Sequence, residues 1–214
     1  MKFLLITHGI PNKNSEQANC DPLLFLENLK KHGHVVDIIS IHNKNYFSSS
    51  LSQNYYFKNL KKKYKSNFFF VNKKNKSFFS LVKNKIVNTL KYQISYENDI
   101  NQIRRELKQK INLSRPDCII NFFDLPVVLT GTRPSEKKIP IVNYIGVYKK
   151  NLEKLKIKVY LSENIKNYWR ILTSLLYIYS VDKFYKKYLN LSTLNLCPAK
   201  DTYEALSKLK IKNL

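Results

Sequence analysis

The chain has 214 residues, and 43% of them are hydrophobic, which is enough to build one large domain with a proper core and excludes a disordered tail. The net charge is +23, yet only five of the 38 basic residues are arginine, the side chain that binds phosphate through a bidentate fork. The composition therefore disfavours a nucleic-acid binder, and favours a solvated basic surface or, second, attraction to an anionic membrane.

Cysteines and apolar runs indicate where the protein resides. Cys20, Cys118 and Cys197 are widely spaced and form no CxxC pair, which favours reduced thiols over disulfides or a zinc site. The first apolar run is too short for a signal peptide, and the longest one, residues 171–181, is shorter than the ~20 residues that span a bilayer. We expect a cytoplasmic protein, with a peripheral position at the inner face of the membrane as the alternative.

The first elements in chain order predict a βαβ unit. Buried strands are expected at residues 2–7 and 35–41. Between them, residues 21–34 carry leucines at helical spacing and predict a helix. Asp21 is expected to cap this helix, with Pro22 at its first position and Gly33 at its end.

The remaining elements alternate in the same way. Residues 42–76 lose the pattern and are interpreted as a variable insertion with one strand candidate, SNFFFVN, whereas residues 77–112 resemble a basic helix that ends before Pro116. Further strands are expected at 117–123, 139–146 and 192–197, and helices at 125–133, 162–189 and 199–209. This alternation predicts an α/β fold, a Rossmann-like parallel sheet with helices on both faces.

The aromatic-rich helix expected over residues 162–189 allows two interpretations. Four residues recur at helical spacing and are favoured as part of the core: Leu172, Leu175, Leu176 and Tyr179. Trp169, the tyrosines and the flanking cations resemble a basic helix that lies at a membrane interface, so a membrane-facing rim is the alternative.

Ligands of parallel sheets bind outside the carboxyl ends of the strands, so the loops that follow the strands carry the candidate site. His8 and Gly9 follow the first strand, where His8 can hydrogen-bond a ligand hydroxyl or have no task. Asn121 and Asp124 end the strand at 117–123, and Asp124 is either a helix N-cap or a carboxylate that binds sugar hydroxyls or acts as a base. Gly146 ends the next strand and serves a turn or admits a ligand.

Several motifs are missing from the sequence. It contains neither a dinucleotide-binding glycine motif nor a phosphate-cradling loop. A Ser-His-Asp set, a metal-ligand cluster and a close pair of carboxylates are also missing, which disfavours hydrolases and metalloenzymes. We expect no cofactor and no metal ion.

Four segments in order resemble the N-terminal domain of GT-B glycosyltransferases, and of family 4 in particular. They are MKFLLITHGIP with the following helix and strand, PDCIINFFDLP, IPIVNYIG, and LNLCPAKDTYEALSKLKI. The resemblance implies that residues 1–214 are a single GT-B N-terminal Rossmann-like domain, with the C-terminal donor-binding domain absent.

The resemblance also implies a function. Such a domain binds the acceptor, a glycan or lipid-linked sugar, while a separate C-terminal domain supplies the nucleotide-sugar donor for transfer in lipopolysaccharide or exopolysaccharide biosynthesis. In this chain Asp124 is the catalytic candidate, and His8, Gly9, Asn121 and Gly146 are the substrate-binding candidates. We expect no nucleic-acid partner. The alternative is a non-catalytic membrane- or partner-binding module, or a relic of such an enzyme, so enzymatic activity stays open.

Overall fold

A computed structural model of the chain describes residues 1–11, 17–43, 51–73, 97–122, 139–162 and 168–214. The strands in these residues are β1 (Lys2–His8), β2 (Val35–Asn43), β3 (Phe68–Lys73), β4 (Cys118–Asn121), β5 (Ile141–Tyr144) and β6 (Leu194–Leu196). The helices are α1 (Gln17–Lys31), α2 (Leu51–Tyr64), α4 (Glu97–Ser114), α6 (Lys149–Ser162), α7 (Tyr168–Leu189) and α8 (Lys200–Lys208).

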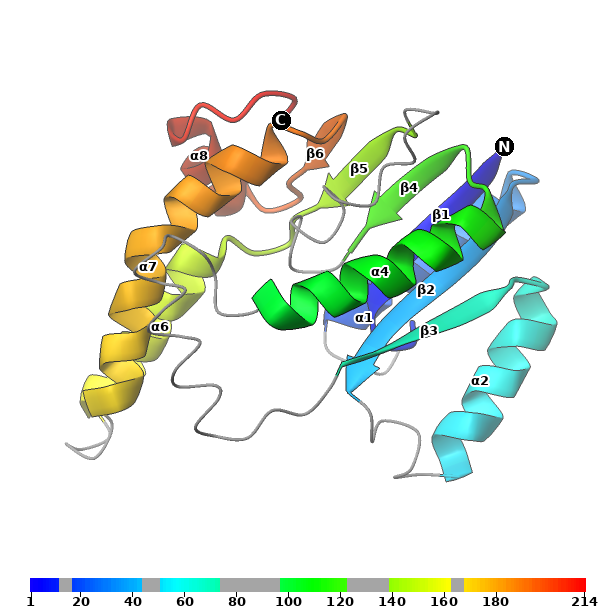
Figure 1. Cartoon of the computed structure of the whole chain (residues 1–214), viewed down its shortest axis with the longest axis horizontal. Coiled ribbons are helices and arrows are strands. Elements are labelled where there is room, and N and C mark those ends of the chain that lie inside the picture. Colours follow the sequence, from blue (N-terminus) through cyan, green and yellow to red (C-terminus); the bar gives the residue numbers. More distant parts are fainter. Residues whose placement is uncertain (12–16, 44–50, 74–96, 123–138, 163–167) are drawn as a thin grey trace.

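All six strands form one parallel sheet in the order β3-β2-β1-β4-β5-β6 (Figure 1). The chain starts in the middle of the sheet, builds outward to β3, and then returns to build the other half from β4 to β6. This is the strand order of a doubly wound, Rossmann-like fold. The predicted α/β class is therefore confirmed.

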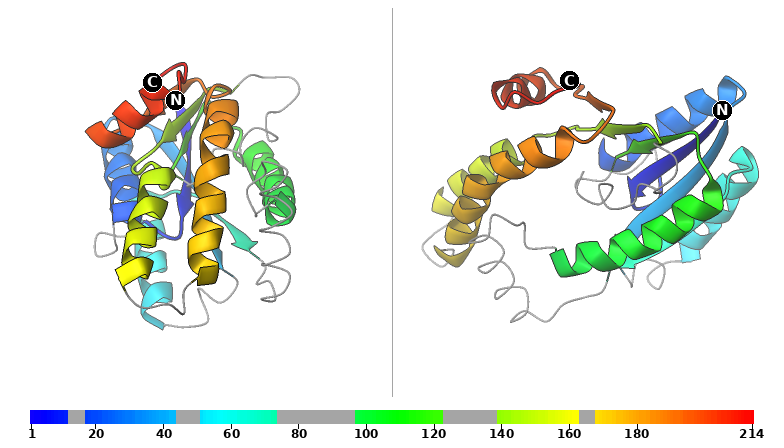
Figure 2. Two further views of the ribbon diagram at one scale, coloured as in Figure 1. Left: turned by 90° about the vertical axis from the view of Figure 1, so that its left-hand side faces the viewer. Right: turned by 45° about the horizontal axis from the view of Figure 1, so that its top comes forward.

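Helices cover both faces of the sheet (Figures 1 and 2). Successive strand residues point to opposite faces, so Leu4 and Ile6 of β1 face α4, while Leu5 between them faces α1. The α4 side is completed by Leu107 and Ile111 of that helix. On the other side, residues of both α1 and α2 pack on the sheet: Leu23, Leu26, Leu60 and Tyr64.

Helix α1 differs from its prediction at one end and agrees at the other. It begins at Gln17, so Pro22 lies inside the helix and Asp21 is not its N-cap. The proline removes one helical hydrogen bond, but its ring is buried in the core. At the other end Gly33 has a φ of +76°, and the His34 N–H donates to the Leu29 carbonyl at 3.0 Å, a Schellman termination that confirms the predicted stop.

Residues 51–73, within the segment interpreted as a variable insertion, form α2 and the edge strand β3. The phenylalanines of β3 hold α2 in place, since the Phe57 ring lies 5.2 Å from that of Phe68 and 5.1 Å from that of Phe70. This part of the segment belongs to the sheet. Its helix escaped prediction because lysine and asparagine separate the few residues that pack.

The later strands and helices lie close to where they are expected, and β4, β5, β6, α7 and α8 confirm those predictions. Helix α4 confirms the predicted end before Pro116. The helix predicted at 125–133 lies outside the described residues, and α6 was not predicted. None of the helices in the described residues is long and apolar enough to cross a membrane.

The core prediction for α7 is wrong for Leu172, Leu175 and Tyr179, which are exposed. Leu176 is half-buried. The helix packs into the protein mainly through its C-terminal half, where the buried residues are Val181, Tyr185 and Leu189. Its N-terminal half runs past the sheet beside α6, so a different face of the helix becomes the inner one (Figure 1).

A buried carboxylate marks the amino-terminal edge of the sheet. Asp37 of β2 is buried and accepts hydrogen bonds from Ser114 Oγ at 2.7 Å and Asn67 Nδ2 at 3.1 Å. Lys2 Nζ lies 2.9 Å from the same carboxylate. Because these three side chains engage both oxygens of the carboxylate and ligands bind at the opposite edge, we assign Asp37 a structural role.

Candidate functional site

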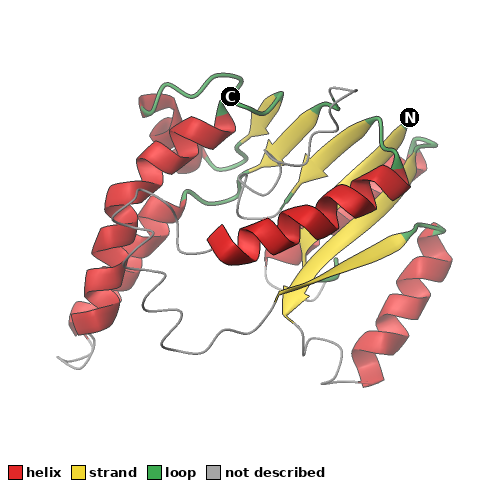
Figure 3. Ribbon diagram, in the orientation of Figure 1, coloured by secondary structure: helices red, strands yellow, loops and turns green. Residues whose placement is uncertain are grey.

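The carboxyl ends of β1, β4, β5 and β6 lie side by side at one edge of the sheet (Figure 3). In the strand register Ile6 is paired with Asn121, Asn121 with Asn143, and Asn143 with Asn195. The strand order reverses between β1 and β4, and such a reversal opens a crevice at the carboxyl ends. This edge is the candidate site.

The turn after β1 is fixed by backbone bonds around Gly9. The Gly9 N–H donates to the Ile41 carbonyl at 3.0 Å, and its carbonyl accepts from Thr7 Oγ1 at 2.7 Å. Gly9 has a φ of +87°, a conformation that side chains with a Cβ disfavour. His8 is the last residue of β1 and so lies at the predicted edge, but its side chain is outside the described part of the structure.

Three buried asparagines form a ladder just beneath the edge. Asn121 Nδ2 donates to Asn143 Oδ1 at 3.0 Å, and Asn143 Nδ2 donates to Asn195 Oδ1 at 3.2 Å. Ser192 Oγ also donates to Asn195 Oδ1, and the Asn195 amide reaches the Leu189 and Lys212 carbonyls. Since the three amides are buried and bond to one another, they support the strand ends from within.

A carboxylate and a tyrosine meet at the same edge, on the α1 face. Tyr144, the last residue of β5, donates its hydroxyl hydrogen bond to Asp21 Oδ2 at 2.8 Å. Both side chains are half-buried. Burial raises the pKa of Tyr144 to about 12, and the bond to Asp21 adds to the shift because ionisation would place two negative charges together.

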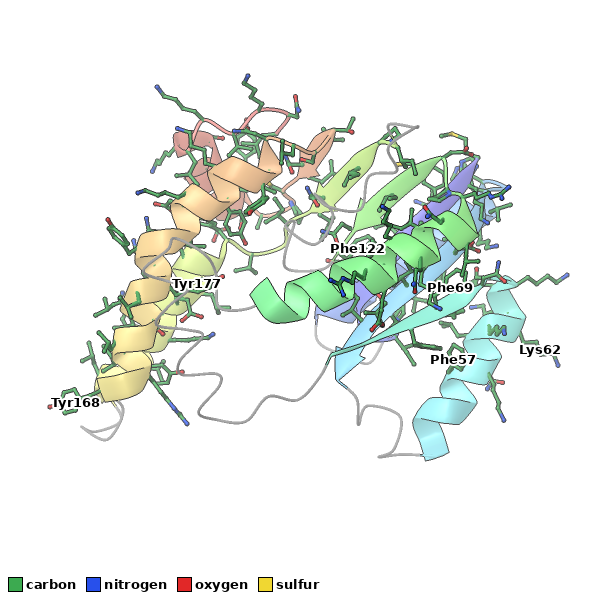
Figure 4. All side chains as sticks on the ribbon, in the orientation of Figure 1. Phe57, Lys62, Phe69, Phe122, Tyr168 and Tyr177 are labelled. Carbon is green, nitrogen blue, oxygen red and sulfur yellow. The ribbon has the colours of Figure 1, made fainter. Side chains whose placement is uncertain are left out.

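Two aromatic rings pack around Tyr144 of this pair. The Tyr144 ring lies 5.7 Å from that of Phe25 and 5.1 Å from that of Phe122, and those two rings are 5.1 Å apart. Figure 4 labels Phe122 at the end of β4, close to the middle of the sheet. A carboxylate has room for more than one donor, so Asp21 can bind a ligand hydroxyl while it holds Tyr144. Aromatic rings beside a carboxylate suit a ligand with both C–H faces and hydroxyl groups.

The predicted site residues differ in their surroundings and in their exposure. His8, Gly9 and Asn121 come from neighbouring strand ends, and Asn121 is buried in the ladder. Gly146 is exposed in the turn after β5, where its carbonyl accepts from Thr202 Oγ1 at 3.4 Å. A Cβ added at Gly146 would meet no atom within 4 Å, so the position does not need glycine for space. Asp124 lies outside the described residues.

Sequence reasoning missed the Asp21–Tyr144 pair and the ladder. The two members of the pair are 123 residues apart, and nothing in the sequence links them. The ladder is visible in the sequence as a pattern, since asparagine follows apolar residues in each of the strands CIIN, IVN and LN. Equal positions of one polar residue in three neighbouring parallel strands predict side-chain bonds between them.

The described thiols are free and buried to different degrees. Burial raises the pKa of the Cys118 thiol, and it raises that of Cys197 to about 11. Both are therefore protonated and weakly nucleophilic at neutral pH. No cluster of His, Cys, Asp or Glu suited to a metal ion occurs within the described residues.

Comparisons with known proteins show a structural likeness to a glycosyltransferase. No protein-family model matches the sequence, and no curated protein matches it. The fold is similar to the crystal structure of SsfS6, a glycosyltransferase of Streptomyces sp. SF2575, with a TM-score of 0.41 and 12% identity over 92% of this chain and 51% of that one. The chain spans about half the length of that protein. At this TM-score the likeness carries no argument, and the fold class rests on the strand order above.

Proposed function

We propose that this chain is the acceptor-binding half of a glycosyltransferase. It would bind a glycan or lipid-linked sugar at the carboxyl edge of its sheet, while a separate domain supplies a nucleotide-sugar donor. The observation that carries the proposal is the half-buried Asp21 carboxylate, held by Tyr144 beside two aromatic rings at the edge where Rossmann-like sheets bind ligands. The sequence resemblance to GT-B N-terminal domains supports it.

Roles for the remaining candidates follow from this proposal. Asp124 is the proposed base that takes a proton from the acceptor hydroxyl, since it follows β4 by three residues in the sequence. Gly9, with its positive φ and its hydrogen bond to Ile41, fixes the turn after β1, and the proposed sugar site lies beside this turn and His8. The biological setting we propose is cell-surface glycan biosynthesis, such as lipopolysaccharide or exopolysaccharide assembly.

Binding of free sugars tests the proposal directly. Saturation-transfer NMR would use the methyl glycosides of glucose, galactose and N-acetylglucosamine and the corresponding disaccharides. We expect Asp21→Asn to weaken binding about tenfold, because a charge-assisted hydrogen bond to the sugar is lost. The matched control is Glu204→Gln, which makes the same change at an exposed carboxylate on α8 and should leave binding unchanged.

Binding of nucleotide-sugar donors is the measurement that can contradict the proposal. The proposal requires that UDP-glucose and GDP-mannose do not bind the chain tightly by itself, because the donor belongs to the other domain. Tight binding of either nucleotide sugar would contradict an acceptor-binding half. If the parent protein and Asp21→Asn bind sugars with equal affinity, the Asp21–Tyr144 pair is not part of the sugar-binding site.

A non-catalytic membrane- or partner-binding module is the second candidate function. The observation in its favour is a row of exposed apolar side chains on α7. If this is the whole function, the sugar experiment fails while a surface-binding experiment succeeds. The two candidates are therefore separable by measurement.

A further inference from the structure

Helices α6 and α7 form an antiparallel hairpin that runs away from the sheet (Figures 1 and 2). Polar contacts fix it internally. Ser174 Oγ of α7 donates to Glu153 Oε2 of α6 at 2.7 Å, and Lys156 Nζ lies 2.7 Å from the other oxygen of Glu153. At the base of the hairpin, Tyr148 and Lys150 both contact the Asp182 carboxylate. The hairpin is therefore a packed element with a defined outer surface.

The outer surface of α7 carries an apolar stripe. Four residues are spaced by four, three and four positions, so they lie on one side of the helix: Tyr168 (68% exposed), Leu172 (44%), Leu175 (52%) and Tyr179 (64%). A monomeric protein rarely exposes four large apolar side chains on one side of a helix without a partner for them.

Cations continue the stripe on the same side of α7. Lys183 and Lys186 are exposed, and they follow Tyr179 by four and then three further positions. Within the two described helices the acidic residues are Glu153 and Asp182, and both are already engaged by the contacts inside the hairpin. The outer surface is thus apolar and positively charged at once.

We propose that the α6–α7 hairpin docks on an anionic lipid surface. The outer side of α7 would contact the lipid: Leu172 and Leu175 would enter the boundary between headgroups and acyl chains, the tyrosine rings would sit at headgroup level, and Lys183 and Lys186 would contact lipid phosphates. A second copy of the chain fits this surface poorly, because it would bring the same lysines against one another on molecules that each carry +23. The proposal does not depend on sugar transfer.

Vesicle sedimentation of the full chain tests the docking. The probes are vesicles of phosphatidylcholine alone and of phosphatidylcholine mixed with phosphatidylglycerol, each at low and high salt. We expect binding to the mixed vesicles at low salt, with a loss of at least tenfold in the partition coefficient at high salt because the charges are screened. No binding to the mixed vesicles would overturn the proposal.

Matched variants locate the binding surface. Leu172→Ser with Leu175→Ser should reduce the partition coefficient at least tenfold, whereas Leu113→Ser, at a 68% exposed leucine on α4, should not change it. Lys183→Gln with Lys186→Gln should also reduce the partition coefficient, in contrast to Lys61→Gln with Lys62→Gln on α2.

Other outcomes reject the proposal in distinct ways. Equal effects of the two lysine pairs would mean diffuse attraction by the whole basic protein and would overturn docking by the hairpin. A dimer in sedimentation velocity that disappears with the Leu172 and Leu175 changes would assign the stripe to a second copy instead. Circular dichroism checks that each variant keeps its helical content, as expected for exposed positions.

Discussion

At the scale of single residues, Tyr144 couples the stability of the protein to alkaline pH. Its pKa in the folded protein is about 12, above the value near 10 of an ordinary tyrosine, so folding favours the protonated form. The stabilisation is therefore complete below about pH 10 and is lost as the pH rises toward 12.

The measurement for Tyr144 is urea unfolding at pH 8 to 12 of the parent protein and of Tyr144→Phe. We expect the free energy of unfolding of the parent to fall more steeply above pH 10 than that of the variant. The other tyrosines and the lysines titrate in both proteins, so the difference between the two curves isolates Tyr144. If the free energies of unfolding of the two proteins fall in parallel with pH, the hydrogen bond to Asp21 does not raise the pKa of Tyr144.

Two glycines at strand ends make a second comparison at this scale. Gly9 has a positive φ, whereas Gly146 does not and has open space around it. We expect Gly9→Ala to lower the free energy of unfolding by about 1–2 kcal/mol, the cost of a Cβ in the left-handed region. Gly146→Ala should stay within about 0.5 kcal/mol of the parent in the same urea titration. If both substitutions lower the free energy of unfolding by a similar amount, the positive φ of Gly9 is not the cause of the loss.

At the scale of elements, the asparagine ladder joins β4, β5 and β6 beneath the candidate site. Asn143→Ala removes its middle rung and leaves the buried Asn121 amide without the acceptor it had. We expect a loss of about 2 kcal/mol in the free energy of unfolding, since removing one partner of a buried hydrogen bond costs about 1–3 kcal/mol. Chemical denaturation followed by circular dichroism measures it.

The control for the ladder is Asn112→Ala, the same change at an exposed residue of α4, which should be nearly neutral. Because the rungs bond to one another, the combined Asn121→Ala and Asn143→Ala changes should cost less than the sum of the two single changes. Strict additivity would mean that the amides act independently and that no ladder exists in solution.

At the scale of the whole molecule, the sequence predicts the sheet well because buried parallel strands are short apolar runs between helical segments. It fails for α2, whose few packing residues stand among lysines and asparagines, and for the outer face of α7, whose leucines look like core residues. The edge that carries the candidate site follows from parallel topology alone. The Asp21–Tyr144 pair does not, because only the folded sheet brings α1 and the end of β5 together.

The buried Asp37 carboxylate ties the folding of distant segments together. Its partners come from the first strand, from the residue before β3 and from the end of α4, and Ser114 is 77 residues away in sequence. A carboxylate is poorly tolerated in a protein interior until all such partners are present. We therefore expect partly folded forms to keep Asp37 hydrated, and the half of the sheet that holds β1, β2 and β3 to unfold together with α4.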